Sequence, residues 1–163
     1  MKIMQLLPEL NSGGVERGTL EIARALIAAG HESIVVSNGG RLVAQLEAEG
    51  SQHLSLAIHK KSLSSLWQIR PLRKLIQQHQ PHIVHVRSRV PAWLTHFALK
   101  GIPANQRPHL ISTVHGFYST NRYSAIMTQA EKVIAVSDSV VQYITEHYKN
   151  CPPENIVRIY RGI

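Results

Sequence analysis

Two adjacent glycines lie where an apolar stretch meets a helical pattern near the start of the chain. Gly13 and Gly14 follow the apolar residues 2–7 and precede an amphipathic segment. Because glycine has no Cβ, the backbone of such a turn can come close to a ligand. The following helix would direct unpaired N–H groups and its positive dipole end at that ligand, which suits a phosphate or carboxylate. The pattern therefore predicts an anionic ligand here, and a plain tight turn is the alternative.

Cationic and aromatic-ring side chains follow two later strand-like segments. Arg87 and Arg89 come at the end of residues 82–87, and His115 ends residues 109–115. Ligands of doubly wound sheets bind beyond the carboxyl ends of the strands, so these side chains would share one edge with the glycine turn. Side chains alternate along a strand, so both arginines would point to the same side if the strand persists. Surface ion pairing of the arginines and a structural role for His115 are the alternatives.

Seven short apolar runs alternate with helical patterns along the chain, and these would have to position the polar residues. The alternation predicts an α/β fold, a Rossmann-like, doubly wound parallel sheet with right-handed crossovers and about seven strands. The strands are predicted at residues 2–7, 33–37, 52–56, 82–87, 109–115, 132–136 and 156–160.

Proline and serine mark the expected helices. Residues 62–80 have a helical pattern that we expect Pro71 to break or kink. Pro91 fits the first turn of a helix that runs to Lys100. Ser137 can cap the helix that follows it.

The length and composition of the chain indicate one domain with a hydrophobic core. The 163 residues are 44% hydrophobic and only 6% aromatic, as expected for buried parallel strands covered by helices. No run approaches the roughly 18 apolar residues of a membrane span. Residues 1–10 lack a small-residue cleavage site, so they predict a first strand rather than a signal peptide. The single cysteine, Cys151, cannot form an internal disulfide, which favours a cytosolic setting.

The chain is basic, with 18 Lys and Arg against ten Asp and Glu and a formal charge of +8. The cations are spread along the chain in small groups. An anionic partner is indicated: a phosphorylated substrate, an acidic membrane face or nucleic acid. No arginine-rich tract or aromatic–basic interleaving is present, so no nucleic acid is expected as partner. A basic but otherwise ordinary surface is the alternative.

Three common α/β site types lack their motifs. Gly13, Gly14 and Gly18 do not form G-x-G-x-x-G, and the second strand ends at Ser37-Asn38 without the acidic residue that a nicotinamide site needs. The Gly-Lys-Ser/Thr of a P-loop and the G-x-S-x-G elbow of a serine hydrolase are absent as well. These three classes are excluded.

Four segments, taken in order, resemble the N-terminal domain of retaining glycosyltransferases of the GT-B fold. This large group includes lipopolysaccharide-core and phosphatidylinositol mannosyl enzymes. The segments are residues 11–18, 113–118, 133–137 and 156–163. The resemblance covers the whole chain and implies that residues 1–163 are a single Rossmann-like domain, the acceptor-side half of a GT-B enzyme, with the donor-binding domain absent from the chain. The last segment departs from the family's common Asn-Gly-Val-Asp, since Arg161 stands at the Asn position.

The resemblance implies transfer of a hexosyl unit from a nucleotide-sugar donor to an acceptor, with retention, no metal and no other cofactor. The acceptor would be an envelope glycan, as in lipopolysaccharide biosynthesis, or a lipid-linked molecule. The enzyme would be cytoplasmic and peripheral on the inner face of the cytoplasmic membrane, with an anionic membrane surface as a further partner. Because the family's Glu-x7-Glu pair lies in the other domain, this chain alone is expected to be nearly inactive and to bind donor weakly.

Site roles also follow from the resemblance. Gly13, Gly14 and Ser137 would bind the diphosphate or sugar of the donor, whose departure builds negative charge. His115 would be catalytic, by hydrogen bonding a hydroxyl of the transferred sugar or shaping the oxocarbenium-like transition state. No metal ligand is expected. The acceptor-binding residues would be Glu16, Arg87, Arg89, Tyr118 and Arg122.

Two other functions stay open at this point. A GT-B nucleotide-sugar epimerase half would share the architecture and would need a catalytic carboxylate near the glycine turn, where only Glu16 is close. A stand-alone cationic domain that binds an anionic lipid or polymer would need no second domain, and an autonomously folding chain without downstream coding sequence would support it.

Overall fold

Seven parallel strands form one sheet in the part of the chain that the computed structural model describes, residues 1–161. Their order across the sheet is β3-β2-β1-β4-β5-β6-β7, and every neighbouring pair is parallel. The predicted α/β sheet is confirmed, and the last two residues of the segment 156–163, which resembles the glycosyltransferase family, lie outside the described residues. The strands are β1 Lys2–Leu6, β2 Glu32–Ser37, β3 Gln52–Ser55, β4 Ile83–Val86, β5 His109–Val114, β6 Lys132–Ala135 and β7 Ile156–Arg158.

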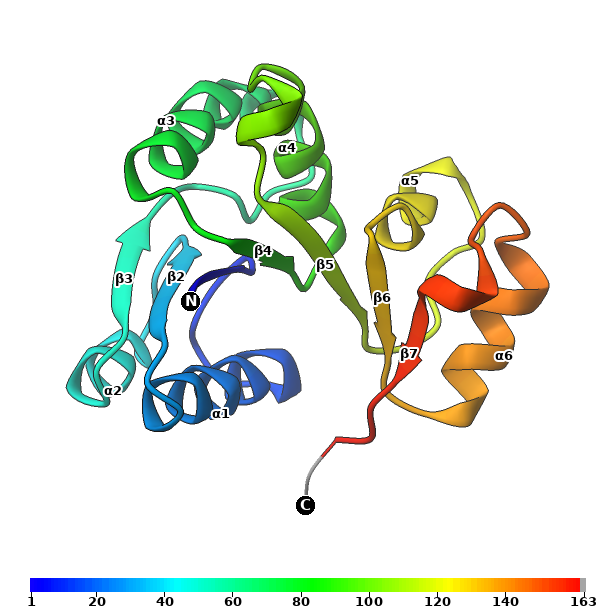
Figure 1. Cartoon of the computed structure of the whole chain (residues 1–163), viewed down its shortest axis with the longest axis horizontal. Helices are drawn as coiled ribbons and strands as arrows, with labels where there is room; N and C mark the ends of the chain where they lie inside the picture. Colours follow the sequence, from blue (N-terminus) through cyan, green and yellow to red (C-terminus); the bar gives the residue numbers. More distant parts are fainter. Residues whose placement is uncertain (162–163) are drawn as a thin grey trace.

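The helices divide between the two faces of this sheet (Figure 1). The chain winds from β1 to β3 in one direction and then crosses back to β4. Right-handed crossovers therefore put α1 and α2 on one face and α3 and α4 on the other. The α-helices are α1 Gly14–Ala28, α2 Val43–Ala48, α3 Ile69–His79, α4 Arg89–Lys100, α5 Arg122–Ala125 and α6 Asp138–His147. The 3-10 helices are η1 Leu63–Gln68, η2 Ala104–Gln106, η3 Ile126–Thr128 and η4 Pro153–Asn155.

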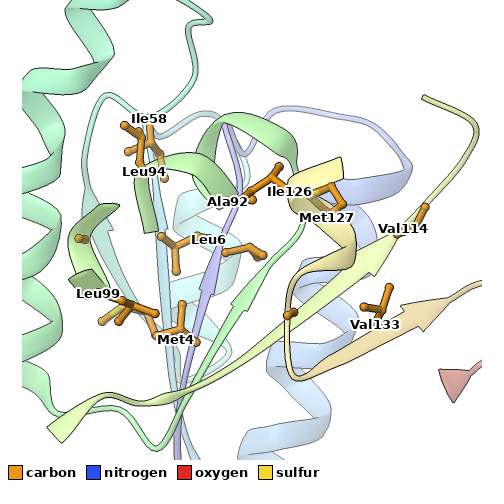
Figure 2. Close-up of a cluster of buried hydrophobic side chains, with 14 of the residues drawn as sticks. Met4, Leu6, Ile58, Ala92, Leu94, Leu99, Val114, Ile126, Met127 and Val133 are labelled. Carbon is orange, nitrogen blue, oxygen red and sulfur yellow. The ribbon is translucent and has the colours of Figure 1, made fainter. Parts of the chain in front are cut away.

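Each face of the sheet has its own hydrophobic core. The larger cluster joins the strands to α3, α4 and α6, and Figure 2 shows Met4 and Leu6 of β1 in it with Leu94 and Leu99 of α4. The smaller cluster holds α1 and α2 against Val35 of β2. Burial on both faces explains why the strands read as nearly continuous apolar runs. Among the described residues, no helix is long and apolar enough to cross a membrane.

The structure corrects two local predictions. The helical region 62–80 changes from 3-10 to α-helix between Gln68 and Ile69, and Pro71 lies in the first turn of α3. Its missing N–H removes no helical hydrogen bond there. The helical region is therefore divided two residues before Pro71, and not at the proline itself. Strand β4 ends at Val86, and Arg89 is already the first residue of α4. The strand therefore does not persist through the two arginines. Pro91 lies in the first turn of α4, as predicted.

Candidate functional site

The glycine turn after β1 is packed closely by two charged side chains. A Cβ added to Gly13 would collide with the carboxylate of Glu16, which folds back over the turn. A Cβ on Gly14 would come within 3.0 Å of the Arg161 guanidinium, whose Nη2 donates a hydrogen bond of 2.7 Å to the Gly14 carbonyl. A side chain at either position would displace the end of Glu16 or Arg161. Glu16 places negative charge at the N-terminus of α1, where the helix dipole favours it.

Arg87 is a buried cation without a counter-ion in the described chain. Its side chain is 4% exposed, and Nε donates a 2.8 Å hydrogen bond to Oε1 of Gln5. Gln5 is fully buried in β1, and its amide reaches the Thr19 carbonyl of α1 at 3.3 Å. None of the ion pairs within residues 1–161 includes Arg87. Burial and the nearby Arg161 lower the pKa of Arg87 to about 10, so it remains charged at neutral pH.

His115 follows β5, and its ring nitrogens have no partner. Nδ1 and Nε2 are both buried, and neither forms a hydrogen bond with any described residue. Burial, then the charges of Arg87 and Arg161, lower the pKa of His115 to about 4. The imidazole is therefore neutral near pH 7, with one nitrogen a donor and the other an acceptor. Buried polar atoms without partners cost free energy, so a water or a ligand atom that bound beside the ring would stabilise it.

Arg87 and His115 line one pocket at the carboxyl edge of β4, β5 and β6. Its walls are mainly apolar, and Arg161 lies at its boundary with a second pocket at the glycine turn. The first pocket is lined by Gly18, Glu21, Ile22, His85, Arg87, Thr113, His115, Ile134, Val136, Ile159, Tyr160 and Arg161. The second is lined by Ser12, Gly13, Gly14, Arg17, Glu21 and Arg161. The two pockets share Glu21 and Arg161, so a ligand larger than either could extend across both.

Arg89 has a different environment from Arg87. Its guanidinium lies 5.0 Å from the ring centres of both Tyr118 and Tyr123, and Nη1 donates a 3.0 Å hydrogen bond to the Ser124 hydroxyl. Arg89 thus links α4 to the segment between β5 and α5. Tyr118 is half-buried and burial raises the pKa of its hydroxyl. These residues form a group beside the His115 pocket and do not line it.

Ser137 and Arg122 line neither pocket. Ser137 caps α6, as predicted, because its hydroxyl accepts a 3.2 Å hydrogen bond from the Val140 amide. Arg122 is exposed at the start of α5. The structure therefore brings Gly13, Gly14 and Glu16 together around one pocket edge, with Arg87 and His115 in the adjoining pocket.

Sequence reasoning missed two residues of this arrangement. Gln5 is a polar residue within the apolar run of the first strand, and that mismatch was the available signal. Arg161 lies 147 residues from Gly14 in the chain, and only the fold brings the two together.

Comparisons with known proteins identify the family of this chain. The sequence profile of Glycosyltransferase Family 4 matches residues 12–163. A solved glycosyltransferase from Rickettsia africae ESF-5 is 34% identical with a TM-score of 0.83, over 99% of this chain and 43% of that chain. A comparison with curated protein sequences gave no match.

Two more distant structures share the fold. HepE from Anabaena, solved in complex with UDP-glucose, is 17% identical with a TM-score of 0.77, over 100% of this chain and 44% of that one. The lipopolysaccharide outer core galactosyltransferase WaaB is 14% identical with a TM-score of 0.76, over 100% and 46%. This chain thus spans less than half the length of the proteins it matches. With the fold of the N-terminal half of GT-B enzymes, the chain belongs to Glycosyltransferase Family 4.

Proposed function

We propose that this chain is the acceptor-side domain of a retaining glycosyltransferase that moves a hexosyl unit from a nucleotide-sugar donor to an envelope glycan or lipid-linked acceptor. The observation that carries the proposal is the pair formed by His115, whose buried ring nitrogens have no partner in the described chain, and Arg87, a buried cation without a counter-ion there. A polar ligand with an anionic group would satisfy both.

Phosphate is the anionic group that best fits the cations. Burial, and after it the charge of Arg161, lowers the pKa of Arg87, so a negative ligand between the two cations would stabilise the charge of Arg87. Arg17 and Arg161 line the adjoining pocket at the glycine turn. In a transfer reaction, the departing nucleoside diphosphate builds negative charge that such donors stabilise. HepE binds UDP-glucose, which supports a sugar diphosphate as donor here.

His115 would hydrogen bond a sugar hydroxyl as a neutral imidazole. Its pKa of about 4 makes it a poor acid near pH 7 but leaves it both a donor and an acceptor. Burial makes such a hydrogen bond selective, because leaving the ring nitrogens unpaired is costly. Positioning of the transferred sugar is therefore its proposed role. Glu16, Arg89, Tyr118 and Arg122 are proposed to face the acceptor, and Gly13, Gly14 and Ser137 the donor.

The proposed location is cytoplasmic, at the inner face of the cytoplasmic membrane. The formal charge of +8 supports it, because basic surfaces are attracted to anionic lipid headgroups. The acceptor class is proposed from the resemblance to lipopolysaccharide enzymes and from the relation to WaaB, whose name refers to the lipopolysaccharide outer core.

The test is His115→Ala in the full-length protein that contains this chain. Turnover of a UDP-sugar in the presence of lipopolysaccharide-core acceptors is expected to fall by about a hundredfold, the usual loss for one transition-state hydrogen bond. His109→Ala is the control, because His109 is exposed and pairs with Glu131 away from the pocket. Turnover of His115→Ala within a few-fold of the wild type would remove His115 from the site.

The epimerase alternative has one residue in its favour, since the Glu16 carboxylate does lie against the glycine turn. The same full-length protein incubated with UDP-N-acetylglucosamine alone distinguishes the two. Formation of the 2-epimer without acceptor would replace the transferase proposal, whereas acceptor-dependent release of UDP supports it.

A further inference from the structure

Three apolar side chains of the 3-10 helix η1 project into solvent. Leu63 is 84% exposed, Trp67 81% and Leu66 48%, and the first two are the most exposed large apolar side chains in the described chain. Leu63 and Leu66 are three residues apart, which puts them on one side of a 3-10 helix. The buried side of η1 is formed by Ser65, which bonds to the carbonyl of Lys60.

Four cations lie close to these side chains along the chain. Lys60, Lys61, Arg70 and Lys74 are all exposed. We refer to the three apolar and four basic residues together as the η1 patch.

The η1 patch lies in a segment without acidic residues. Residues 50–130 contain ten Lys and Arg and no Asp or Glu, a net charge of +10. The rest of the chain has eight cations against ten acids, a net charge of −2. The cations are thus spread almost evenly along the chain, as predicted, and it is the acidic residues that are absent from this segment. Helices α3 and α4 of this segment lie together on one face of the sheet (Figure 1).

A row of stacked side chains connects the η1 patch to the candidate site. The ammonium of Lys61 lies 4.0 Å from the ring centre of Tyr123, and that ring lies 5.0 Å from the guanidinium of Arg89. Arg89 in turn lies 5.0 Å from the Tyr118 ring, three residues after His115. The η1 patch and the His115 pocket therefore share the carboxyl edge of the sheet.

We propose that the η1 patch docks on an anionic lipid bilayer, with Leu63, Leu66 and Trp67 inserted at the level of the headgroups and the cations bound to lipid phosphates. Tryptophan with a polar N–H favours this interface, and lysine can hold its charge in water while its stem lies along the lipid. Three projecting side chains offer much less than the roughly 800 Å² per partner of a standard protein interface, but they suffice for interfacial insertion supported by charge.

The inference rests on the membrane location in the proposed function but not on the transfer reaction. It adds a specific surface, and it orients the carboxyl edge of the sheet toward the bilayer. A lipid-linked acceptor would then reach the His115 pocket without leaving the membrane.

The test uses co-sedimentation of this chain with vesicles of phosphatidylethanolamine that contain phosphatidylglycerol as the minority lipid. Binding is expected to weaken as salt rises and to be absent with phosphatidylcholine vesicles. Leu63→Gln with Trp67→Gln should weaken it at least about tenfold. Lys60→Gln with Arg70→Gln and Lys74→Gln should weaken it by about a hundredfold, roughly fivefold for each charge. Trp67 emission should shift to shorter wavelength on binding, and Trp67→Phe should abolish that shift.

Matched controls keep the result specific. Val157→Gln removes an exposed apolar side chain elsewhere, and Arg41→Gln with Lys149→Gln removes two exposed charges outside the segment; neither set should change binding. Binding that survives the η1 substitutions would overturn the inference but leave the membrane location standing. No binding to anionic vesicles would overturn both. Self-association through the same residues without lipid would make the η1 patch a protein interface and overturn it too. Donor binding is unaffected by each outcome, so the transfer proposal is judged separately.

Discussion

Arg87 keeps its charge in a buried position because the chain provides one neutral acceptor and leaves the rest of the guanidinium to a ligand. Gln5 accepts a hydrogen bond from Nε at the centre of β1, and no carboxylate of the described chain forms an ion pair with Arg87. A carboxylate in place of Gln5 would neutralise the site. Arg87 and His115 could be predicted from their positions after strands, but Gln5 could not be assigned a role, since its partner lies 82 residues away.

Glu16 occupies the position that an anion at the glycine turn would take. Its carboxylate lies against Gly13 at the N-terminus of α1. Glu16→Gln is therefore expected to raise the affinity of the chain for UDP or inorganic phosphate by about fivefold, because about 1 kcal/mol of competition for the helix dipole is removed. Isothermal titration calorimetry measures the affinity for UDP or phosphate, with Glu47→Gln on α2 as the control. An unchanged or weaker affinity would contradict the competition and favour direct contact of Glu16 with the ligand.

His115 should make stability depend on pH. The pKa of His115 is about 4 in the folded chain, whereas the ordinary value for a histidine is 6.5. Between pH 4 and pH 6.5 the unfolded chain therefore binds more protons at this residue than the folded chain does. Stability is then complete above about pH 6.5 and is lost as pH falls toward 4, by about 2–3 kcal/mol. Buried His85, whose pKa is also lowered, acts in the same direction. Urea unfolding at pH 7.5 and 5 should show a smaller difference for His115→Phe than for the wild type. An equal difference would mean that His115 is solvated.

At the scale of elements, the strands and the caps were the most predictable features, because both depend on neighbouring residues. All seven predicted strands exist within residues 1–161, with ends that differ by one or two positions. The prediction of a break or kink at Pro71 in residues 62–80 was wrong in position, because sequence alone does not show in which turn of a helix a proline lies. Pro71 falls in the first turn only because η1 precedes α3. Arg89 was misplaced for a related reason, since α4 begins sooner after β4 than the apolar run indicated.

Ser137 caps a helix and also has a proposed functional role, and its substitution separates the two. The hydroxyl caps α6 through the Val140 amide, so Ser137→Ala should lower the free energy of unfolding by about 1 kcal/mol. Thr145→Ala is the control, because Thr145 is exposed near the other end of α6 and its hydroxyl donates only to the Val141 carbonyl. Urea unfolding gives both values. If Ser137→Ala weakens UDP binding without loss of stability, the donor role outweighs the cap.

At the scale of the whole molecule, the site depends on the return of the chain after β7 to the turn after β1. Arg161 bonds the Gly14 carbonyl, and its charge contributes to the low pKa values of Arg87 and His115. No local pattern could predict this, since it joins the two ends of the described chain. The sequence pattern predicted the sheet and the edge at which ligands bind, whereas the pairing of side chains across that edge required the tertiary structure.

Arg161→Gln tests whether the contact of Arg161 with the turn after β1 shapes the site. Loss of the positive charge should raise the pKa of His115 from about 4 toward its ordinary value, because Arg161 is one of the two charges that lower it. Phosphate should bind more weakly, since one of the cations that line both pockets is gone. Titration of the His115 ring by NMR gives the first result and phosphate titration the second, with Arg41→Gln as a charge-matched control. An unmoved His115 titration would show that the residues after β7 leave the site in solution. The pocket at His115 and the pocket at the glycine turn, both of which Arg161 lines, would then lose this shared wall before any substrate binds.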